Sequence, residues 1–500
     1  MTPPVTPEAY ARGRREGDGG ATAVAKTSLA APARTAALAV LALTLVAYVA
    51  LALGYATLTP IWENPDEPAH YNYVAFVAET GGLPTLQPGD WDSALLDRLK
   101  NGRLQPGDSV GSIRYEAWQP PLFYLAAAPL FRLGPVDDPA VQVFRLRTFD
   151  IVIGGLTLGI AFLTARALFP PHLAAAVPIA IVGIPMFTAV SAAISADPLA
   201  NLLAASLLLV LVRRIGREHT DAVLTVSPEP DGQLGGPSGV APLTHAGASR
   251  GPGWSQRPST LLSRAYPGWC WPVGAGVLLG LGLLTKLALA IFVPLALLVL
   301  LVRSSRPIRE GALLLCTSGL VVLPWLVHQV TTYGWTDPLA TSRHAAVVLD
   351  QQRFPGLSLT YVGDFLTITF HSFWAQFGWM AIVAPARLYW IWGLALILAL
   401  GGLGLARRRL YAEPAWRLVL ATIVAAGLGY IGYNLTFEQF QGRYLFTALV
   451  PIGMLFVLGW AAWLPRRVQS WGLVLIGAGL VGLNAYALVR VLVPGFAPTG

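Results

Sequence analysis

"TAALAVLALTLVAYVALALGYATL", residues 35–58, is an uncharged apolar run long enough to cross a bilayer as a helix. It is too long for the core of a signal peptide and lacks a small-residue cleavage site, so we expect it to stay in the mature protein as a helix. Of the 500 residues, 55% are hydrophobic and 12% are charged, whereas soluble domains carry about 25% charged residues. The sequence therefore predicts an all-α polytopic integral membrane protein.

Hydrophobic windows predict about eleven transmembrane helices, within a range of about ten to thirteen. They lie near residues 35–58, 149–168, 172–192, 198–212, 271–284, 287–302, 311–328, 388–406, 416–434, 444–464 and 471–493. With a cytoplasmic N-terminus, the arginines between the spans gather on the cytoplasmic side, as the positive-inside rule expects. These are Arg166, Arg213, Arg214, Arg217, Arg303, Arg306, Arg309, Arg407, Arg408, Arg409, Arg466 and Arg467. The net charge of +8 is thus explained without a nucleic-acid partner.

The segment "QPPLFYLAAAPLFRLG" (119–134) sets the orientation of the helices that follow it. It is apolar but short, and three prolines interrupt it, so we interpret it as a helix that lies in the membrane interface. If it crossed the membrane, the next three helices would invert, and Arg213 and Arg214 would move to the outer face. The positive-inside rule argues against that topology.

The polar segments divide the chain into four parts. Residues 1–33 are predicted to be a disordered cytoplasmic tail, and residues 34–214 a membrane module with a large outer loop at 59–145 that contains interfacial helices. Residues 215–268 are rich in Gly, Pro and Ser and are predicted to be a disordered cytoplasmic linker. Residues 269–495 form the second membrane module, whose outer loop spans 329–387.

The outer loop opens with "IWENPDEPAHYNYV" (61–74), which concentrates charge beside the membrane. Helix capping explains part of this charge, because Asn64 followed by proline suits a helix start and the acids complement its positive end. Capping explains only one or two acids, and here Glu63, Asp66 or Glu67, and His70 recur at three- and four-residue spacing on one helical face. A carboxylate beside an imidazole can act as general base for a hydroxyl acceptor or can hold a divalent cation. Both interpretations stay open.

Two further acids are expected near this loop. Asp197 in "SADPLAN" lies where one predicted helix ends and the next begins, and capping with Pro198 at the first helical position is the simple explanation. The predicted topology, however, brings Asp197 to the same outer face as Asp66, so the two acids can meet over one site. Glu116 in "YEAWQPPLFY" can line the same outer cleft.

Two basic residues complete the candidate site. Lys286 in "GLGLLTKLALA" interrupts a long apolar stretch, where a central lysine costs roughly 2.5 to 3.5 kcal/mol and therefore needs a partner or water. The alternative is that two short helices meet at Lys286, which then snorkels at their outer turn. Arg443 in "FEQFQGRYLF" begins a helix on the outer side, and the alternative there is an interfacial anchor. Two cations facing two acids suit a phosphate leaving group beside a base.

Several motifs resemble those of the GT-C glycosyltransferases. They are "NPDEPAHYNYV", "EAWQPPLFYL", "SADPLAN", "SFWAQFGW" and "QGRYLFTALVPI", spread from about residue 35 to 490 with the linker left out. The superfamily includes protein O-mannosyltransferases, lipid A aminoarabinose transferases and oligosaccharyltransferase catalytic subunits. The sequence is most similar to a bacterial multi-spanning family that carries the same PDEPAH motif.

The resemblance implies a membrane glycosyltransferase. It would transfer a sugar from a polyprenyl-phosphate donor, with inversion, to a cell-envelope glycan, a glycolipid or a protein. The implied location is the bacterial cytoplasmic membrane, with the N-terminus in the cytoplasm and the active site outside.

The resemblance also implies roles for individual residues. By position, Asp66 corresponds to the base and Glu67 would support it, while Asp197 would orient the acceptor or a metal ion. Lys286 and Arg443 would bind the donor phosphate.

His70 is not shared across the wider superfamily. We therefore leave its role open and place it with Glu116 as a residue that orients the acceptor or a metal ion. No cofactor is certain, and a divalent cation is the one that the residues suggest.

A transporter or flippase of lipid-linked glycans is the main alternative, because an intramembrane Lys286 and outer acids can mark a substrate path. Transporters tend to have internal repeats and sites near the midplane of the membrane. The sequence shows no repeat with a period of 20 to 50 residues, and its polar candidates gather at one face. A subunit without chemistry, in which the acids cap helices and the cations anchor them, is a third interpretation.

Overall fold

The computed structural model describes residues 8–100, 109–133, 138–216 and 269–497. These residues are mostly helical, and their only sheet is one antiparallel pair of two-residue strands, β1 (Gln376–Phe377) and β2 (Ile382–Val383). The predicted all-α fold is confirmed. In chain order, the helices before residue 217 are α1 (Glu8–Leu58), α2 (Glu67–Thr80), α3 (Ser93–Lys100), η1 (Val110–Ser112), α4 (Leu122–Phe131), α5 (Pro139–Ala165), α6 (Pro171–Val182), α7 (Pro185–Val190) and α8 (Asp197–Gly216).

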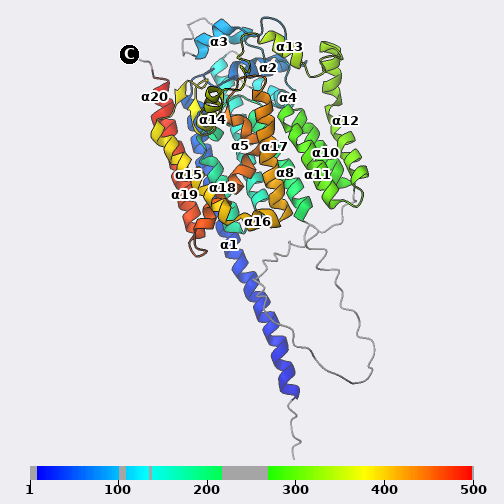
Figure 1. The fold of residues 1–500 in the computed structure, drawn as a ribbon, viewed down its shortest axis with the longest axis vertical. Coiled ribbons are helices and arrows are strands. Elements are labelled where there is room, and N and C mark those ends of the chain that lie inside the picture. The colour runs from blue at the N-terminus through cyan, green and yellow to red at the C-terminus, as the bar shows by residue number, and fades with distance from the viewer. Residues whose placement is uncertain (1–7, 101–108, 134–137, 217–268, 498–500) are drawn as a thin grey trace, which may run out of the picture.

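The helices after residue 268 continue the same bundle. They are α10 (Cys270–Leu283), η3 (Leu287–Ile291), α11 (Phe292–Arg303), α12 (Pro307–Tyr333), α13 (Thr341–Val347), α14 (Leu359–Trp374), α15 (Ala386–Leu405), α16 (Arg407–Ala412), α17 (Pro414–Asn434), η4 (Gly442–Ala448), α18 (Leu449–Trp463), α19 (Gln469–Ala487), η5 (Leu488–Leu492) and α20 (Val493–Gly495). Figure 1 shows the long helices packed along one another, with α2, α3, α4 and α13 gathered at one end of the bundle. We call this the cap end.

Eight helices of the described residues are long and apolar enough to cross a membrane, by length and composition. They are Ala33–Leu58, Pro139–Ala165, Asp197–Gly216, Pro307–Tyr333, Ala386–Leu405, Pro414–Asn434, Gly442–Trp463 and Gln469–Gly495. Three shorter apolar helices, Pro171–Val182, Cys270–Leu283 and Leu287–Arg303, occupy the other three predicted spans. Together they account for the eleven segments that the sequence predicts.

The segment that was predicted to lie in the interface forms only α4. A helix of ten residues is about 15 Å long, half of what a bilayer core requires. The first residue of α4 is bonded to the residue that follows α10, because Leu122 N donates to Leu284 O over 2.9 Å. α4 therefore belongs to the cap end and does not invert the helices that follow.

The predicted disordered segments are for the most part outside what the structure describes. The linker expected at 215–268 lies outside the described residues from residue 217 onward. α1 begins at Glu8, within the predicted tail 1–33, and its side chains are described from Ala33. The disorder expected of both segments stays a prediction.

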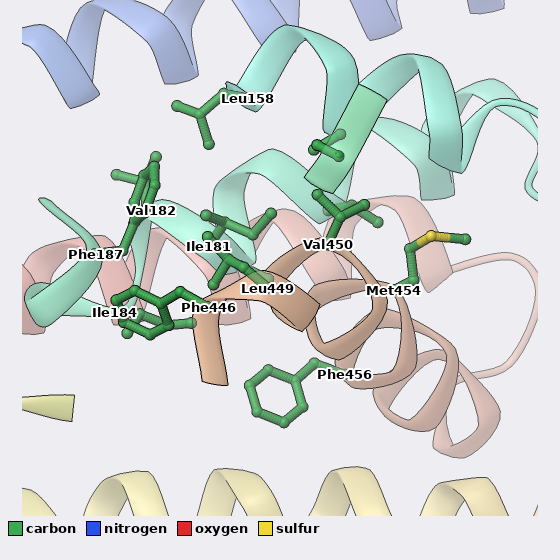
Figure 2. Packing of buried hydrophobic residues seen from close by; sticks show 14 of the residues in the cluster. Leu158, Ile181, Val182, Ile184, Phe187, Phe446, Leu449, Val450, Met454 and Phe456 are labelled. Atoms are coloured by element: carbon green, nitrogen blue, oxygen red, sulfur yellow. The ribbon is translucent and has the colours of Figure 1, made fainter. Parts of the chain in front are cut away.

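One apolar core joins helices from both sides of that linker. In Figure 2, Ile181 and Phe187 from the α6 and α7 region lie beside Phe446 of η4 and Leu449 and Val450 of α18. The two membrane modules predicted from sequence thus share one core. Because η4 is packed into it, the position of Arg443 is set by the bundle.

The start of η4 is held closely from the other side. A Cβ at residue 442 would collide with the backbone of Thr369 and Phe373 in α14, so glycine is required there. Ser372 Oγ accepts a hydrogen bond from Gly442 N over 2.8 Å and donates to Phe440 O over 3.0 Å. The backbone next to Arg443 is therefore fixed on two sides, and this sets the point from which the Arg443 side chain extends.

A second apolar cluster lies within the cap end and joins it to α5. It includes Tyr73 and Val74 of α2, Phe123 and Tyr124 of α4, and Leu146 of α5. Its buried aromatic rings fix α2 and α4 against the top of α5. The acidic turn before α2 is thereby placed directly over the bundle.

Candidate active site

Asp66 does not cap the helix that it precedes. α2 begins at Glu67, and Asp66 occupies the capping position in a left-handed conformation (φ 65°) without a side-chain capping bond. Its Oδ1 instead accepts a hydrogen bond from Tyr115 Oη over 2.7 Å, and its Oδ2 is paired with Arg443 Nη2. The capping interpretation, which started the helix at Asn64, therefore does not describe this carboxylate.

Asp197 is the first residue of α8, and its carboxylate faces the same place. It forms an ion pair with Lys286 Nζ, and its Oδ2 lies 3.8 Å from Arg443 Nη1. The Arg443 guanidinium thus bridges Asp66 and Asp197. The structure brings together two acids and two cations that come from four separate segments of the chain.

Lys286 lies at a break between two short helices. It has extended backbone angles (φ −156°, ψ 128°) between α10 and η3, as the two-helix alternative expects. Its side chain is only 25% exposed, and its ammonium is paired with Asp197 and lies 5.3 Å from the centre of the Tyr444 ring. The break aims the lysine at the acids.

Arg443 is held by more than the acids. Its Nε donates to Gln441 Oε1 over 2.6 Å, and its guanidinium carbon lies 5.6 Å from the centre of the Tyr444 ring. Its side chain is 9% exposed. Buried charges are tolerated when they are paired and hydrogen-bonded, and here two carboxylates balance two cations.

Glu116 lies beside this charge set with one oxygen, Oε2, buried and without a hydrogen-bond partner. Burial raises the pKa of Glu116 to about 8, and the negative charge of Asp66 adds to the effect. A carboxyl with that pKa is largely protonated at neutral pH. Glu116 therefore adds a hydroxyl-bearing group rather than a third negative charge.

His70 follows Asp66 by one helical turn, and its ring is buried against α4. Its Nδ1 lies 2.8 Å from Tyr124 Oη, and the two rings are stacked at 5.8 Å. Burial lowers the pKa of His70 to about 4, although Asp66 and Asp197 act in the opposite direction. The imidazole is therefore neutral at physiological pH.

Glu67 points away from Asp66. Its carboxylate receives a two-pronged bond from Arg147, with Nη2 at 2.6 Å and Nε at 2.8 Å. Both side chains are buried. The structure therefore separates two adjacent acids that the sequence placed in one catalytic pair.

The described residues do not fit a resident divalent cation. No three His, Cys, Asp or Glu side chains among them are grouped as metal ligands. The carboxylates of Asp66 and Asp197, which are the natural oxygen ligands, already face Arg443 and Lys286. We therefore derive no step through a metal ion.

Three residues of the site were not singled out from the sequence. Tyr115 bonds Asp66, Tyr444 lies against both cations, and Tyr124 contacts His70. Tyr115 and Tyr124 lie in "YEAWQPPLFY" and Tyr444 lies in "FEQFQGRYLF". Their sequence pattern carries no distinguishing signal, because aromatic residues are common at the membrane interface.

Neither a family model nor a curated protein matches this sequence. Among solved structures, the chain is similar to ArnT from Cupriavidus metallidurans bound to undecaprenyl phosphate, at 15% identity and a TM-score of 0.49, over 90% of this chain and 73% of that one. It is also similar to the apo oligosaccharyltransferase of Archaeoglobus fulgidus, at 13% identity and a TM-score of 0.45, over 92% of this chain and 55% of that one.

The archaeal oligosaccharyltransferase AglB from Archaeoglobus fulgidus, in complex with an inhibitory peptide and a dolichol-phosphate, aligns at 13% identity and a TM-score of 0.44. This chain spans about half the length of that enzyme, 55%. Oligosaccharyltransferases are one of the classes that the sequence motifs resemble. With TM-scores below 0.5, the likeness leaves the activity of this chain to be decided by its own site residues.

Proposed function

We propose that this protein is a membrane glycosyltransferase that moves a sugar from a polyprenyl-phosphate donor to a hydroxyl acceptor at the cap end. The observation that carries the proposal is the partly buried set in which Arg443 bridges Asp66 and Asp197 while Lys286 pairs with Asp197. The two cations of this set can bind a phosphate directly beside a carboxylate that can act as a base.

Lys286 and Arg443 bind the donor phosphate in this proposal. As the bond between the anomeric carbon and the phosphate oxygen breaks, its electron pair goes to the phosphate, whose negative charge increases. Cations that are already in place in a site shielded from water stabilise this charge more strongly in the transition state than in the ground state. The cations therefore lower the barrier to departure of the carrier.

Asp66 is the base in this proposal. Burial acts to raise the pKa of Asp66, but the charge of Arg443, with a smaller contribution from the hydrogen bond of the Tyr115 hydroxyl, outweighs it and holds the pKa below its usual range. A phosphate that engages Arg443 draws this cation from the carboxylate, so the proton affinity of Asp66 rises when the donor is bound.

The reaction is then a single displacement with inversion. The acceptor oxygen forms a bond to the anomeric carbon, the bond to the phosphate oxygen breaks, and the acceptor proton passes to Asp66. Tyr115 holds the carboxylate in place through its hydroxyl. The acceptor belongs to the class of cell-envelope glycans, glycolipids or proteins.

The arginine distribution supports an extracytoplasmic site. Arg213 and Arg214 end α8, Arg303 ends α11, and α16 carries Arg407, all at the end of the bundle opposite the cap end. By the positive-inside rule that end faces the cytoplasm. The cap end and the proposed active site then face outward, in the cytoplasmic membrane of a bacterium.

The donor reaches this site from the lipid in the proposal. A cavity of about 30 Å³ adjoins Arg443 and is walled mainly by apolar side chains, among them Met186, Val190, Phe377 and Met380. This volume holds little more than a water-sized molecule, so the proposal requires the apolar side chains beside Arg443 to move when the first carbons of a lipid tail enter. A flippase is the alternative function, and the sugar-transfer experiment distinguishes it from a glycosyltransferase.

Lys286→Ala tests the proposed phosphate-binding site. Loss of one charge-assisted hydrogen bond, worth about 1.5 to 3 kcal/mol, is expected to weaken donor binding or slow transfer by about 10 to 100-fold. Binding of a labelled polyprenyl-phosphate sugar and its rate of transfer are the measurements, with Lys286→Arg as the matched variant that keeps the charge. If Lys286→Ala behaved as the unchanged protein does, Lys286 would be a snorkelling residue.

Glu116→Gln tests whether the neutral carboxyl is needed. In the unchanged protein, transfer is expected to decline as the pH rises through about 8, because ionised Glu116 would place a second negative charge beside Asp66. Glutamine cannot ionise, so the variant is expected to lose this alkaline decline while keeping measurable transfer. Profiles of kcat/KM against pH for the two proteins provide the comparison, since they report groups of the free enzyme. If kcat/KM declined in the same way above pH 8 in both proteins, ionisation of Glu116 would not be the cause of the decline.

A further inference from the structure

Arg147 of α5 anchors the chain between α1 and α2. It is 1% exposed, and its Nη1 donates to Ala56 O over 2.8 Å and to Thr59 O over 2.7 Å. Its Nη2 donates to Pro60 O over 3.0 Å. One guanidinium thus satisfies three carbonyl groups where α1 ends, in addition to its two bonds to Glu67.

Glu67 extends this anchor to two other segments. Its Oε2 accepts from Trp62 N over 3.0 Å, and its Oε1 accepts from Asn64 Nδ2 over 3.2 Å. The same Oε1 lies 3.3 Å from Ile194 N, in the turn before α8. The carboxylate that follows Asp66 therefore ties its own turn to the turn that leads to Asp197.

Asp150, one helical turn beyond Arg147 on α5, holds the second turn from below. Its Oδ2 accepts from Ser195 N over 3.1 Å, and Ser195 Oγ accepts from Asp197 N over 3.1 Å. Asp150 is fully buried. Side chains of α5 thus hydrogen-bond to both turns, the one that carries Asp66 and the one that leads to Asp197.

The first of these turns needs such support. Trp62 and Asp66 both have left-handed backbone angles, with φ of 71° and 65°. Side chains other than glycine adopt this region at a conformational cost, and it persists where the surroundings over-determine it. Arg147 bonds three carbonyl groups just before Trp62, and Glu67 accepts hydrogen bonds from Trp62 N and from Asn64 Nδ2, which lies between the two strained residues.

We propose that Glu67, Arg147 and Asp150 form a brace that fixes the separation and aim of Asp66 and Asp197, so that one guanidinium can bridge them. These are positioning residues, because they act on the reaction through the two acids. The proposal rests on the proposed function for its kinetic consequence, but its geometric claim holds without it.

Arg147→Lys is the kinetic test, because lysine keeps the charge but cannot supply the forked bonds. We expect kcat to fall by about 10²-fold, the cost of a small misplacement of a catalytic group, with the donor KM changed much less. In a protein that already carries Asp66→Asn, the same change is expected to cost far less, because the brace acts through Asp66. Arg145→Lys is the matched control on the same helix, since Arg145 donates to Leu130 O and Phe131 O of α4 and not to the brace.

A lysine at position 147 can also unfold the protein, so Glu67→Gln with Arg147→Gln serves as the second variant. This pair leaves no buried charge uncompensated. Full kcat in this folded double variant, or equal losses from Arg147→Lys with and without Asp66→Asn, would overturn the proposal.

Cross-linking measures the separation without any activity. In a protein with Cys270→Ser and Cys316→Ser, Asp66→Cys and Asp197→Cys are treated with a short bifunctional thiol reagent, with and without the double glutamine change at positions 67 and 147. We expect the cross-linking rate to drop at least tenfold when the brace is removed, and an unchanged rate would contradict it. If the unchanged protein transfers no sugar while this drop is seen, the proposed function fails and the brace stands.

Discussion

Asp66→Asn is expected to lower the rate of sugar transfer by about 10² to 10⁴-fold, the usual contribution of a positioned general base. Asparagine keeps the size of the side chain and can still accept the Tyr115 hydrogen bond, but it cannot take the acceptor proton. The initial rate of transfer from a labelled polyprenyl-phosphate sugar is the measurement. Membrane insertion and yield in detergent are expected to match those of the unchanged protein.

Asp92→Asn is the matched control for this variant. Asp92 is also an acid of the cap end, where its carboxylate accepts from Leu95 N over 3.0 Å and from Ser112 Oγ over 3.2 Å. It does not contact the four charged residues of the site. Transfer by Asp66→Asn at the rate of the control would show that Asp66 is not the base.

Arg443→Ala is expected to affect both chemistry and folding. It removes the cation that faces the leaving phosphate, and loss of one preorganised electrostatic group typically lowers kcat by about 10² to 10³-fold. It also leaves Asp66 and Asp197 facing each other with Lys286 as their remaining cation, so the melting temperature is expected to fall. Transfer kinetics and thermal unfolding in detergent are the two measurements.

Two comparisons separate these effects. Arg443→Lys keeps a charge but cannot bridge two carboxylates, so it is expected to recover stability more fully than activity. Arg353→Ala is the control, since Arg353 stacks on Phe437 at 4.4 Å and donates to Ala345 O near the same end of the molecule. A folded Arg443→Ala variant that transfers sugar at the rate of the unchanged protein would contradict a phosphate-binding site at this position.

The membrane helices were predictable because lipid requires long apolar segments. The start of α5 was not, since the sequence placed this span at 149–168 and the helix begins ten residues earlier, at Pro139. Gln142, Arg145 and Arg147 depress the hydropathy of residues 139–148. The charges that hide the helix from a hydropathy window are in part those that support the site.

The charged site was predictable in part. Topology alone placed Asp66 and Asp197 on one face, and the cost of a lysine in an apolar stretch indicated a partner for Lys286. The divergence of Asp66 and Glu67 could not be foreseen, because helical spacing assumes regular backbone and Asp66 is left-handed. That one residue turns the two acids toward different partners, Arg443 and Arg147.

Sugar transfer by the purified chain tests the central claim most directly. The protein in mild detergent is offered a panel of radiolabelled polyprenyl-phosphate sugars, with a membrane extract as acceptor and Asp66→Asn alongside. We expect label to move from one donor to a new product with the unchanged protein and not with the variant. Absence of transfer across the panel, together with binding of a lipid-linked glycan that Asp66→Asn does not alter, would contradict the glycosyltransferase and favour a flippase.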